Sequence, residues 1–320
     1  MLYKSGYLFL LIALLLVSGN NVFGSIISGN PKDPNPADTI FVYYLGGQSN
    51  MEGFGFNKDL PAELDKSFGN VWIFQGNAVP DNDQSGGLGL WTNLRPGNGT
   101  GFTSNGISNT FQDRFGVELS FGATLMKHFP GQKTALIKYS RGGSSLQEKA
   151  SGYGTWNPDY TEGNGLNQYD HFLKTVRNAT SVCDIDGDGR VDVLVPAGII
   201  WMQGEADACH TLETAQLYKE NLRQMMTLMR AVFRDKNLPV VIGLIADSNM
   251  DEDGKMMDYL EIVQQAQRDF VADDKHAALV DATLGYSFIP DKWHFTSRDF
   301  IDLGKQFAEA VIKLEKRRVK

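Results

Sequence analysis

Cysteine is scarce in this sequence, with only Cys183 and Cys209 among 320 residues. The pair lacks the spacing of a metal knuckle, so a structural zinc site of that kind is not expected. The two cysteines flank a predicted strand at opposite ends, and this separation disfavours a disulfide unless loops fold back. At this stage the pairing of the two cysteines stays open.

Clusters of basic residues are also scarce. The formal net charge is −8, and the one basic run, Lys316-Arg317-Arg318, lies near the end of the chain. Proteins bind nucleic acid through clustered lysine and arginine, which release counterions from the phosphates. We therefore expect no nucleic-acid partner, and we interpret the basic run as a solvated helix end.

Beyond residue 24 the sequence lacks long apolar runs. Before that point, Lys4 precedes an apolar run from Tyr7 to Val17, and small residues follow as far as Gly24. This order is typical of a secretory signal peptide, and the run is short for a membrane span. The sequence predicts a signal peptide at 1–24, secreted or periplasmic localisation, and no membrane contact after cleavage. An uncleaved membrane anchor is the alternative.

Residues 25–320 are predicted to form one α/β domain, because they are long enough for a large core and contain no repeat or linker. Apolar strand-like runs alternate with segments of helical period, which favours a mostly parallel sheet covered on both faces. The strand-like runs are Thr39–Leu45, Val71–Phe74, Thr134–Tyr139, Ala197–Met202, Val240–Ala246 and Ala278–Val280. The helical stripes include Tyr218–Val232, Met256–Phe270 and Leu303–Leu314.

Two long stretches, roughly 54–111 and 144–168, interrupt this alternation and are rich in glycine, asparagine and aromatic residues. Loops of such length in a compact domain are usually functional. Aromatic rings in them suit stacking on sugars, but for any single ring we favour the interpretation that it pins its loop to the body. The rings in question are Trp91, Tyr153, Trp156 and Tyr160.

A serine follows the first predicted strand, in the order Gly46-Gly47-Gln48-Ser49-Asn50-Met51. In an open parallel sheet, ligands bind beyond the carboxyl ends of the strands, where Ser49 is expected to lie. The two glycines allow a tight turn and a close approach of the backbone. The position suits a nucleophile, which would require a base, normally a histidine held by a carboxylate.

Only five histidines can supply that base, and four are interpreted as structural or solvated: His128, His171, His210 and His276. His294 differs because Asp291 precedes it by three residues, a spacing that lets the carboxylate orient the imidazole. An exposed helix start is the alternative for this pair. The nucleophile elbow Gly-x-Ser-x-Gly of α/β-hydrolases does not fit, because Met51 occupies the last position.

Four blocks in order resemble the SGNH hydrolase superfamily: Gly47-Gln48-Ser49-Asn50-Met51, Gly116-Val117-Glu118, Gln203-Gly204-Glu205-Ala206-Asp207, and Asp291-Lys292-Trp293-His294. They are most similar to the branch of sialate O-acetylesterases and carbohydrate esterase family 6, which includes acetyl xylan esterases. The resemblance spans about residues 40 to 310. It implies a flavodoxin-like three-layer α/β/α sandwich.

The resemblance also implies roles for individual residues. Ser49 would be the nucleophile, His294 the general base and then acid, and Asp291 the orienting carboxylate. The oxyanion hole would comprise the N–H groups of Ser49 and Gly116 and the amide of Gln203, where the superfamily usually has asparagine. A buried amide that supports a strand end is the alternative for Gln203. The residues expected at the substrate are Gln48, Asn50, Gly143, Glu205 and Trp293, with Glu118 and Glu205 bracing the site.

Arg141 follows a predicted strand in the run Arg141-Gly142-Gly143-Ser144-Ser145. Its guanidinium could pair with the carboxylate of an anionic sugar. We favour a structural ion pair instead, because most arginines near strand ends are tied to the protein.

An acidic loop at Asp184, Asp186, Asp188 and Asp192 matches the start of an EF-hand, with Gly189 at its turn. Position 12, normally glutamate, is Val195, and flanking EF-hand helices are not evident. The loop therefore predicts either a structural Ca²⁺ site or an acidic surface turn. The chemistry at Ser49 requires no cofactor.

Taken together, these residues predict a serine carboxylic ester hydrolase that removes acetyl groups from sugar hydroxyls through an acyl-enzyme. The expected partner is an acetylated carbohydrate of the xylan or sialic acid type. The alternatives are a lipase or thioesterase of the same fold and a non-catalytic carbohydrate-binding protein. Oligomeric state stays open.

Overall fold

The computed structural model describes residues 38–318, so the predicted signal peptide lies outside the described residues. A seven-stranded sheet forms its centre, in the order β11-β10-β9-β1-β8-β3-β4. The strands are β1 (Thr39–Gly47), β3 (Phe68–Gln75), β4 (Trp91–Leu94), β8 (Lys133–Ser140), β9 (Val193–Met202), β10 (Val240–Gly243) and β11 (Ala277–Val280). All pairs are parallel except β3 with β4, which confirms the predicted mostly parallel sheet.

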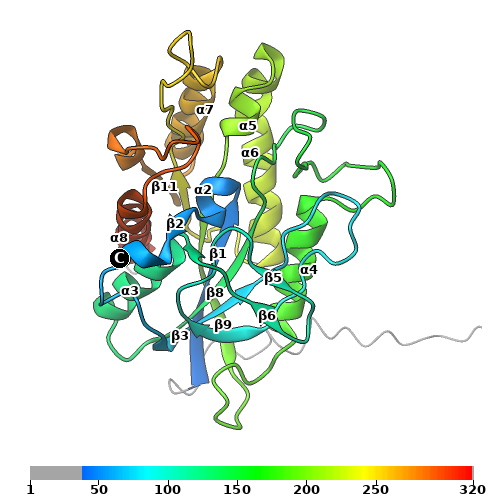
Figure 1. Ribbon diagram of the computed structural model, residues 1–320. Coiled ribbons are helices and arrows are strands. Elements are labelled where there is room, and N and C mark those ends of the chain that lie inside the picture. The colour runs from blue at the N-terminus through cyan, green and yellow to red at the C-terminus, as the bar shows by residue number, and fades with distance from the viewer. Residues whose placement is uncertain (1–37, 319–320) are drawn as a thin grey trace, which may run out of the picture.

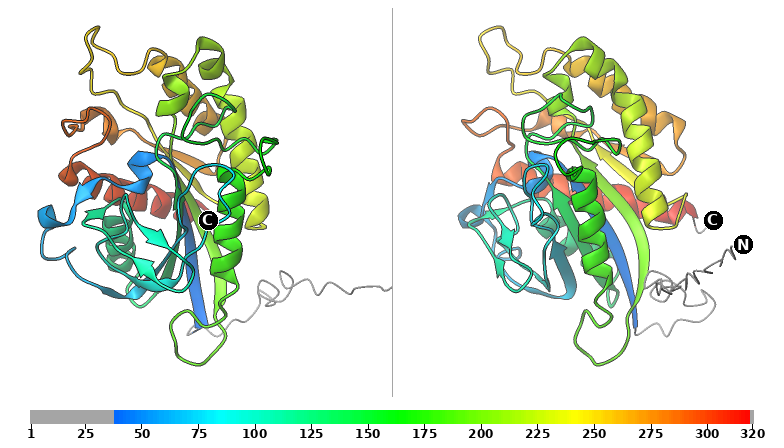
Figure 2. Two further views of the ribbon diagram at one scale, coloured as in Figure 1. Left: turned by 45° about the vertical axis from the view of Figure 1, so that its right-hand side comes forward. Right: turned by 90° about the vertical axis from the view of Figure 1, so that its right-hand side faces the viewer.

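Helices cover both faces of the sheet, as Figures 1 and 2 show. On one face α3 packs against α8, and on the other lie α4, α6 and α7. The long helices are α3 (Glu118–His128), α4 (Gln168–Thr180), α6 (Leu212–Val232), α7 (Leu260–Asp273) and α8 (Ser297–Arg318). No helix of this described part of the chain is long and apolar enough to cross a membrane.

Neighbouring residues of β1 reach both helical layers, because side chains of a strand alternate between its faces. The ring of Tyr43 meets Phe121 of α3 edge-on, with centroids 5.4 Å apart. The ring of Tyr44 meets Phe172 of α4 on the other face, at 4.8 Å. A strand covered on both faces is apolar throughout, which is why the sequence reads as an uninterrupted run here.

β1 lies at the point where the chain changes direction across the sheet. The chain passes from β1 to β3 and β8 on one side, and then to β9, β10 and β11 on the other. Ligands of open α/β sheets bind at such a switch point, beyond the carboxyl ends of the strands. The three-layer plan is the expected flavodoxin-like one, but here β8 lies between β1 and β3, whereas the first two strands of flavodoxin are neighbours.

Short elements lie in the segments that connect the long strands and helices. They are α2 (Ser49–Glu52), α5 (Glu205–Ala208), the 3₁₀ turns η2 (Asn57–Asp59) and η3 (Ala282–Gly285), and two small ladders, β2 (Gly55–Phe56) with β7 (Arg114–Phe115) and β5 (Thr103–Ser104) with β6 (Asn109–Thr110). These ladders and the antiparallel edge strand β4 carry too few apolar residues for the sequence pattern to predict them. Both cysteines are free and exposed.

Candidate active site

Ser49 begins α2, directly after the turn that ends β1, at the top of the sheet in Figure 1. Gly47 has φ +139°, and a side chain there would collide with the carbonyl of Met202 on β9. The next residue, Gln48, donates its backbone N–H to that same carbonyl at 2.8 Å. Only glycine fits this close approach, and the turn it allows leaves Ser49 beyond the strand end, 8% exposed.

His294 and Asp291 form the predicted pair. Nδ1 of His294 lies 2.7 Å from Oδ2 of Asp291, while Oδ1 of Asp291 accepts the backbone N–H groups of Trp293 at 2.9 Å and His294 at 3.1 Å. The segment is a tight turn before α8 and not the start of that helix, with Lys292 at φ +73°. Three hydrogen bonds to one carboxylate thus fix both the turn and the imidazole edge.

A cavity of about 660 Å³ brings Ser49 and His294 together from opposite ends of the chain. Its walls come from the carboxyl ends of β1, β8 and β9 and from the loop before α8. No hydrogen bond joins Ser49 Oγ to His294 within residues 38–318, a common situation in sites without substrate. The lining residues used below are Gln48, Glu52, Phe54, Arg141, Gly143, Tyr153, Glu205 and Trp293.

The charges of the pair suit general-base chemistry. Burial lowers the pKa of His294, and the hydrogen bond that its imidazole donates to Asp291 opposes this effect without cancelling it. Burial alone would raise the pKa of Asp291, but hydrogen bonds from His294 and Trp293 outweigh it, and the net direction is down. At neutral pH the imidazole is therefore neutral and the carboxylate ionised, which are the states a base and its orienting group need.

Two of the predicted oxyanion donors, Gly116 and Gln203, do not line the cavity. The N–H of Gly116 donates to Oε1 of Glu118 at 2.8 Å, and Gly116 does not line the cavity. Nε2 of Gln203 donates to the carbonyl of Ser144 at 3.1 Å and to Oδ2 of Asp207 at 2.7 Å, fully buried. Both predicted roles need correction, because these donors are already bound within the protein.

Gln48 presents an amide to the cavity instead. Its Oε1 accepts the backbone N–H groups of Gly204 at 3.4 Å and Ala206 at 3.3 Å. Those two donors define which end of the amide is oxygen. Its Nε2 has no acceptor among the described residues, so the amide NH₂ is available to a ligand. The sequence placed Gln48 at the substrate, and the structure brings it to the cavity wall.

The other residues expected at the substrate divide into two groups. Gly143, Glu205 and Trp293 line the cavity, and Trp293 is 38% exposed. Burial raises the pKa of Glu205, whose Oε2 has no partner among the described residues. Asn50 does not line the cavity, because its side chain is buried in hydrogen bonds to Glu205 and the loop before α8, so its expected role as a substrate contact is corrected.

Arg141 differs from its favoured interpretation. Arg141 lines the cavity, and its guanidinium forms no ion pair with the residues that the structure describes. Nε donates to the carbonyl of Tyr153 at 3.3 Å, and the backbone N–H donates to the carbonyl of Gly47 at 3.1 Å. The favoured structural ion pair is therefore wrong, and Arg141 is one of the residues that line the cavity.

Among the four aromatic candidates, only Tyr153 reaches the cavity, where it is 64% exposed. Trp156 is fully buried and donates from Nε1 to Oγ of Ser144 at 2.8 Å. Trp91 donates to the carbonyl of Ala179, and Tyr160 accepts from Asn82. Trp91 and Trp156 thus pin their loops to the body, and Tyr160 joins its loop to another, in line with the favoured interpretation.

Sequence reasoning missed several residues of the site. Phe54 and Glu52 line the cavity, and Oε2 of Glu52 accepts the N–H of Gly142 at 2.8 Å. Beneath them Lys138 and Glu118 form a fully buried ion pair at 2.7 Å. A lysine inside the apolar run of β8 was a usable signal, since unpaired lysine is almost never buried. For Phe54 the pattern contained no signal.

The acidic loop lies near the start of β9, away from the cavity. Carboxylate oxygens of Asp184, Asp186 and Asp188 come within 4.8 Å of one another, a spacing that fits a cation. Lys133 pairs with Asp186, however, and Asp192 turns inward to accept the N–H of Ile185. Calcium binding here stays a prediction, with Asp184, Asp186 and Asp188 as its ligands.

A profile of the family described as carbohydrate esterase, sialic acid-specific acetylesterase, matches residues 39–313. No curated protein matches the chain.

Solved structures show the same fold at low identity. A protein from Arabidopsis thaliana has a TM-score of 0.57 and 19% identity, over 85% of this chain and 98% of its own. A carbohydrate acetylesterase from Xanthomonas citri has a TM-score of 0.55 and 19% identity, over 85% of this chain and 56% of its own. NanS has a TM-score of 0.55 and 16% identity, over 88% of this chain and 98% of its own.

Proposed function

The chain belongs to the carbohydrate esterase family of sialic acid-specific acetylesterases, and from that premise we propose that it hydrolyses acetyl esters on sugar hydroxyls, with Ser49 as nucleophile. The observation that carries the proposal is that Ser49 and His294 line one cavity, with His294 hydrogen-bonded to Asp291. Serine, base and orienting carboxylate are the three parts that acyl transfer needs.

In the first half of the reaction, Oγ of Ser49 attacks the ester carbonyl while His294 takes its proton. His294 then returns this proton to the sugar oxygen as the C–O bond breaks, leaving an acetyl group on Ser49. In the second half, His294 takes a proton from water, the hydroxide attacks the acetyl carbonyl, and acetate leaves as Ser49 regains its proton. Asp291 stays ionised throughout and stabilises the imidazolium.

The negative charge that develops on the carbonyl oxygen needs hydrogen-bond donors. We assign this role to the backbone N–H of Ser49 and to Nε2 of Gln48. Support for Gln48 is its fixed amide, held by Gly204 and Ala206 with the NH₂ group left for a ligand. In this assignment Gln48 takes the role that the sequence analysis assigned to Gln203 and Gly116, because the N–H groups of those two residues donate to other groups of the protein.

The sugar is proposed to be acidic, as in O-acetylated sialic acid, rather than neutral, as in acetyl xylan. Arg141 lines the cavity and has no ion pair among the described residues, and a guanidinium matches a carboxylate in two parallel hydrogen bonds. Trp293 and Tyr153 are exposed at the same cavity and offer apolar faces to a sugar ring. The protein is proposed to act outside the cytoplasm, on the strength of the predicted signal peptide.

The test compares acetate release by the wild type and Ser49→Ala from O-acetylated sialic acid, acetylated xylo-oligosaccharides and a long-chain ester. We expect release from the sialic acid ester, abolished by Ser49→Ala with the circular dichroism spectrum unchanged. Preference for the long-chain ester would overturn the sugar assignment in favour of a lipase. Binding of acetylated sugar without any release would identify a carbohydrate-binding protein.

A further inference from the structure

Phe54 lies flat against His294, with ring centroids 3.4 Å apart and planes 4° from parallel. At that distance one face of the imidazole is covered, and the histidine side chain is only 14% exposed. Asp291 holds one edge of the same ring through Nδ1. A single hydrogen bond fixes an edge but leaves the ring free to tilt about it, whereas a flat neighbour fixes the plane.

The backbone of Phe54 is held firmly enough to act as such a neighbour. Nη1 of Arg114 donates to the carbonyl of Phe54 at 2.8 Å. Beyond Phe54 the chain forms β2, which pairs with β7, and the Arg114 guanidinium lies 3.6 Å from the centroid of the Phe56 ring. The position of the Phe54 ring is thus determined by a small ladder rather than by the ring itself.

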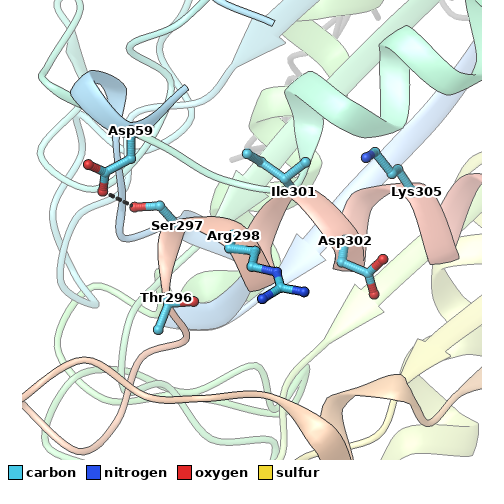
Figure 3. Close-up of a pocket in the computed structure, with 7 residues that line it drawn as sticks. All are labelled: Asp59, Thr296, Ser297, Arg298, Ile301, Asp302 and Lys305. Atoms are coloured by element: carbon cyan, nitrogen blue, oxygen red, sulfur yellow. Dashed lines mark hydrogen bonds between the residues drawn. The ribbon is translucent and has the colours of Figure 1, made fainter. Parts of the chain in front are cut away.

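The same segment is fastened to the element that follows His294. Oγ of Ser297, the first residue of α8, accepts the N–H of Phe56 at 3.0 Å. It also donates to Oδ2 of Asp59 at 2.7 Å, at the wall of a second cavity of about 620 Å³ along α8 (Figure 3). Ser297 lies three residues after His294, so the ring and the imidazole share an anchor.

We propose that Phe54 is a positioning residue for His294: its ring fixes the plane of the imidazole and keeps water from the covered face. This inference rests on the proposed esterase function, which gives the imidazole its role as base. Orientation matters because proton transfer requires the free nitrogen of the base to point at the hydroxyl it deprotonates.

The charged groups around His294 determine which way its pKa moves when the ring is removed. Asp291 on its own loop and Glu52 on α2 favour the imidazolium, and Arg114 on β7 disfavours it. The face of Phe54 also attracts a cation. Burial is nevertheless the largest cause and the net pKa is lowered, so exposing the face to water raises the pKa of His294.

The experiment compares Phe54→Leu with Phe56→Leu, two matched changes in one segment of which only the first removes the ring against His294. For Phe54→Leu we expect kcat for an aryl acetate to fall about tenfold or more. We expect the acidic limb of kcat/KM to move to higher pH by about half a unit. Phe56→Leu should leave the acidic limb of kcat/KM where it is in the wild type. Phe54→Tyr, which keeps an aromatic ring at this position, should have the wild-type kcat and the wild-type acidic limb.

An NMR titration of the His294 Cε1–H signal in each variant measures the same pKa without activity. If Phe54→Leu and Phe56→Leu titrate alike, or if the pKa in Phe54→Leu stays or falls, the role of Phe54 is overturned. If the wild type releases no acetate, the esterase proposal fails, while the titration still decides whether Phe54 shields the imidazole.

Discussion

Nδ2 of Asn50 donates a hydrogen bond to Oε1 of Glu205 at 2.8 Å, and both residues are buried. The same nitrogen reaches the carbonyl of Trp293 at 3.2 Å. Asn50 directly follows Ser49 in α2, and Trp293 directly precedes His294. One amide, anchored by a buried carboxylate, therefore joins the helix of the nucleophile to the loop of the base.

Removing this link is expected to slow the reaction without weakening substrate binding. For Asn50→Ala we predict a fall in kcat of about 10- to 100-fold, because small misplacement of reacting groups costs that much. KM should change less than about threefold, since Asn50 does not line the cavity. Steady-state kinetics check both values. A higher KM at unchanged kcat would instead return Asn50 to the substrate-binding role that the sequence suggested.

Glu205→Gln is the matched variant for this pair. A glutamine keeps an oxygen that can accept from Asn50, so its kcat is predicted to exceed that of Asn50→Ala. Thermal unfolding of all variants separates altered positioning from loss of the fold. Equal losses of kcat in Glu205→Gln and Asn50→Ala would point to a direct role for the carboxylate, whose Oε2 has no described partner.

Substitutions of Gln48 and Gln203 are predicted to have different effects. Gln48→Glu keeps the oxygen that accepts from Gly204 and Ala206 but removes the donor, and kcat should fall by about 10²- to 10³-fold, the usual cost of one oxyanion donor. Gln203→Ala should mainly lower the melting temperature, because its amide bonds are structural. A large loss of kcat in Gln203→Ala at unchanged melting temperature would contradict this assignment.

The pH dependence of activity follows from His294. The base must be neutral, and burial lowers its pKa, so kcat/KM should rise with pH to a plateau through a midpoint below 6.5. In Asp291→Asn the carboxylate that raises this pKa is gone, so the midpoint should move lower still, while the plateau falls about 10³- to 10⁴-fold through loss of the orienting group. A pH–rate profile of an aryl acetate measures both, and a midpoint above 6.5 in the wild type would contradict the buried, neutral imidazole.

The ion pair beneath the site is predicted to matter for stability. Lys138 Nζ donates to Glu118 and to the carbonyls of Glu52 and Asn98, all fully or largely buried. Lys138→Met leaves the Glu118 carboxylate unpaired and should cost about 3–5 kcal/mol of unfolding free energy in urea. Adding Glu118→Gln should recover part of this loss, since the unpaired charge disappears but two carbonyls stay without a donor. No recovery would indicate that the carbonyl contacts dominate.

The sequence predicts well what depends on the strand and helix periods. The buried run of β1 and the glycines after it locate Ser49, and the three-residue spacing locates Asp291 beside His294. The rest depends on contacts between distant segments, which a pattern does not encode. Gln203 and Gln48 are both polar residues that follow a strand, and the sequence pattern does not distinguish them. Only the structure shows that the amide NH₂ of Gln203 is bound by Ser144 and Asp207, whereas the amide NH₂ of Gln48 stays available.

Phe54 illustrates the limit further. Its position depends on the pairing of β2 with β7, two residues each, and on Ser297 of α8, about 240 residues away in the chain. Arg141 illustrates the opposite error, because general experience with arginine favoured an ion pair that residues 38–318 do not provide. Residue types alone suggest several roles for a side chain, and the packing of the loops determines which role it has.

Arg141 gives the prediction that discriminates between substrates. A charge-assisted hydrogen bond contributes about 1.5–3 kcal/mol, so Arg141→Gln should raise KM for O-acetylated sialic acid by about 10- to 150-fold. The same change should leave KM for acetylated xylo-oligosaccharides within about threefold, because a neutral sugar offers no carboxylate. The backbone N–H of residue 141 keeps its bond to the carbonyl of Gly47 in either variant.

Arg141→Lys serves as the control for this prediction. It preserves the charge but not the planar pair of donors, so its KM for the acidic sugar should lie between those of the wild type and Arg141→Gln. If Arg141→Gln raises KM equally for both substrates, the guanidinium supports the loop at Tyr153 and does not bind the sugar. The proposed preference for an acidic substrate would then be wrong. The esterase reaction at Ser49 would be unaffected by that outcome, because acyl transfer needs no charge on the sugar.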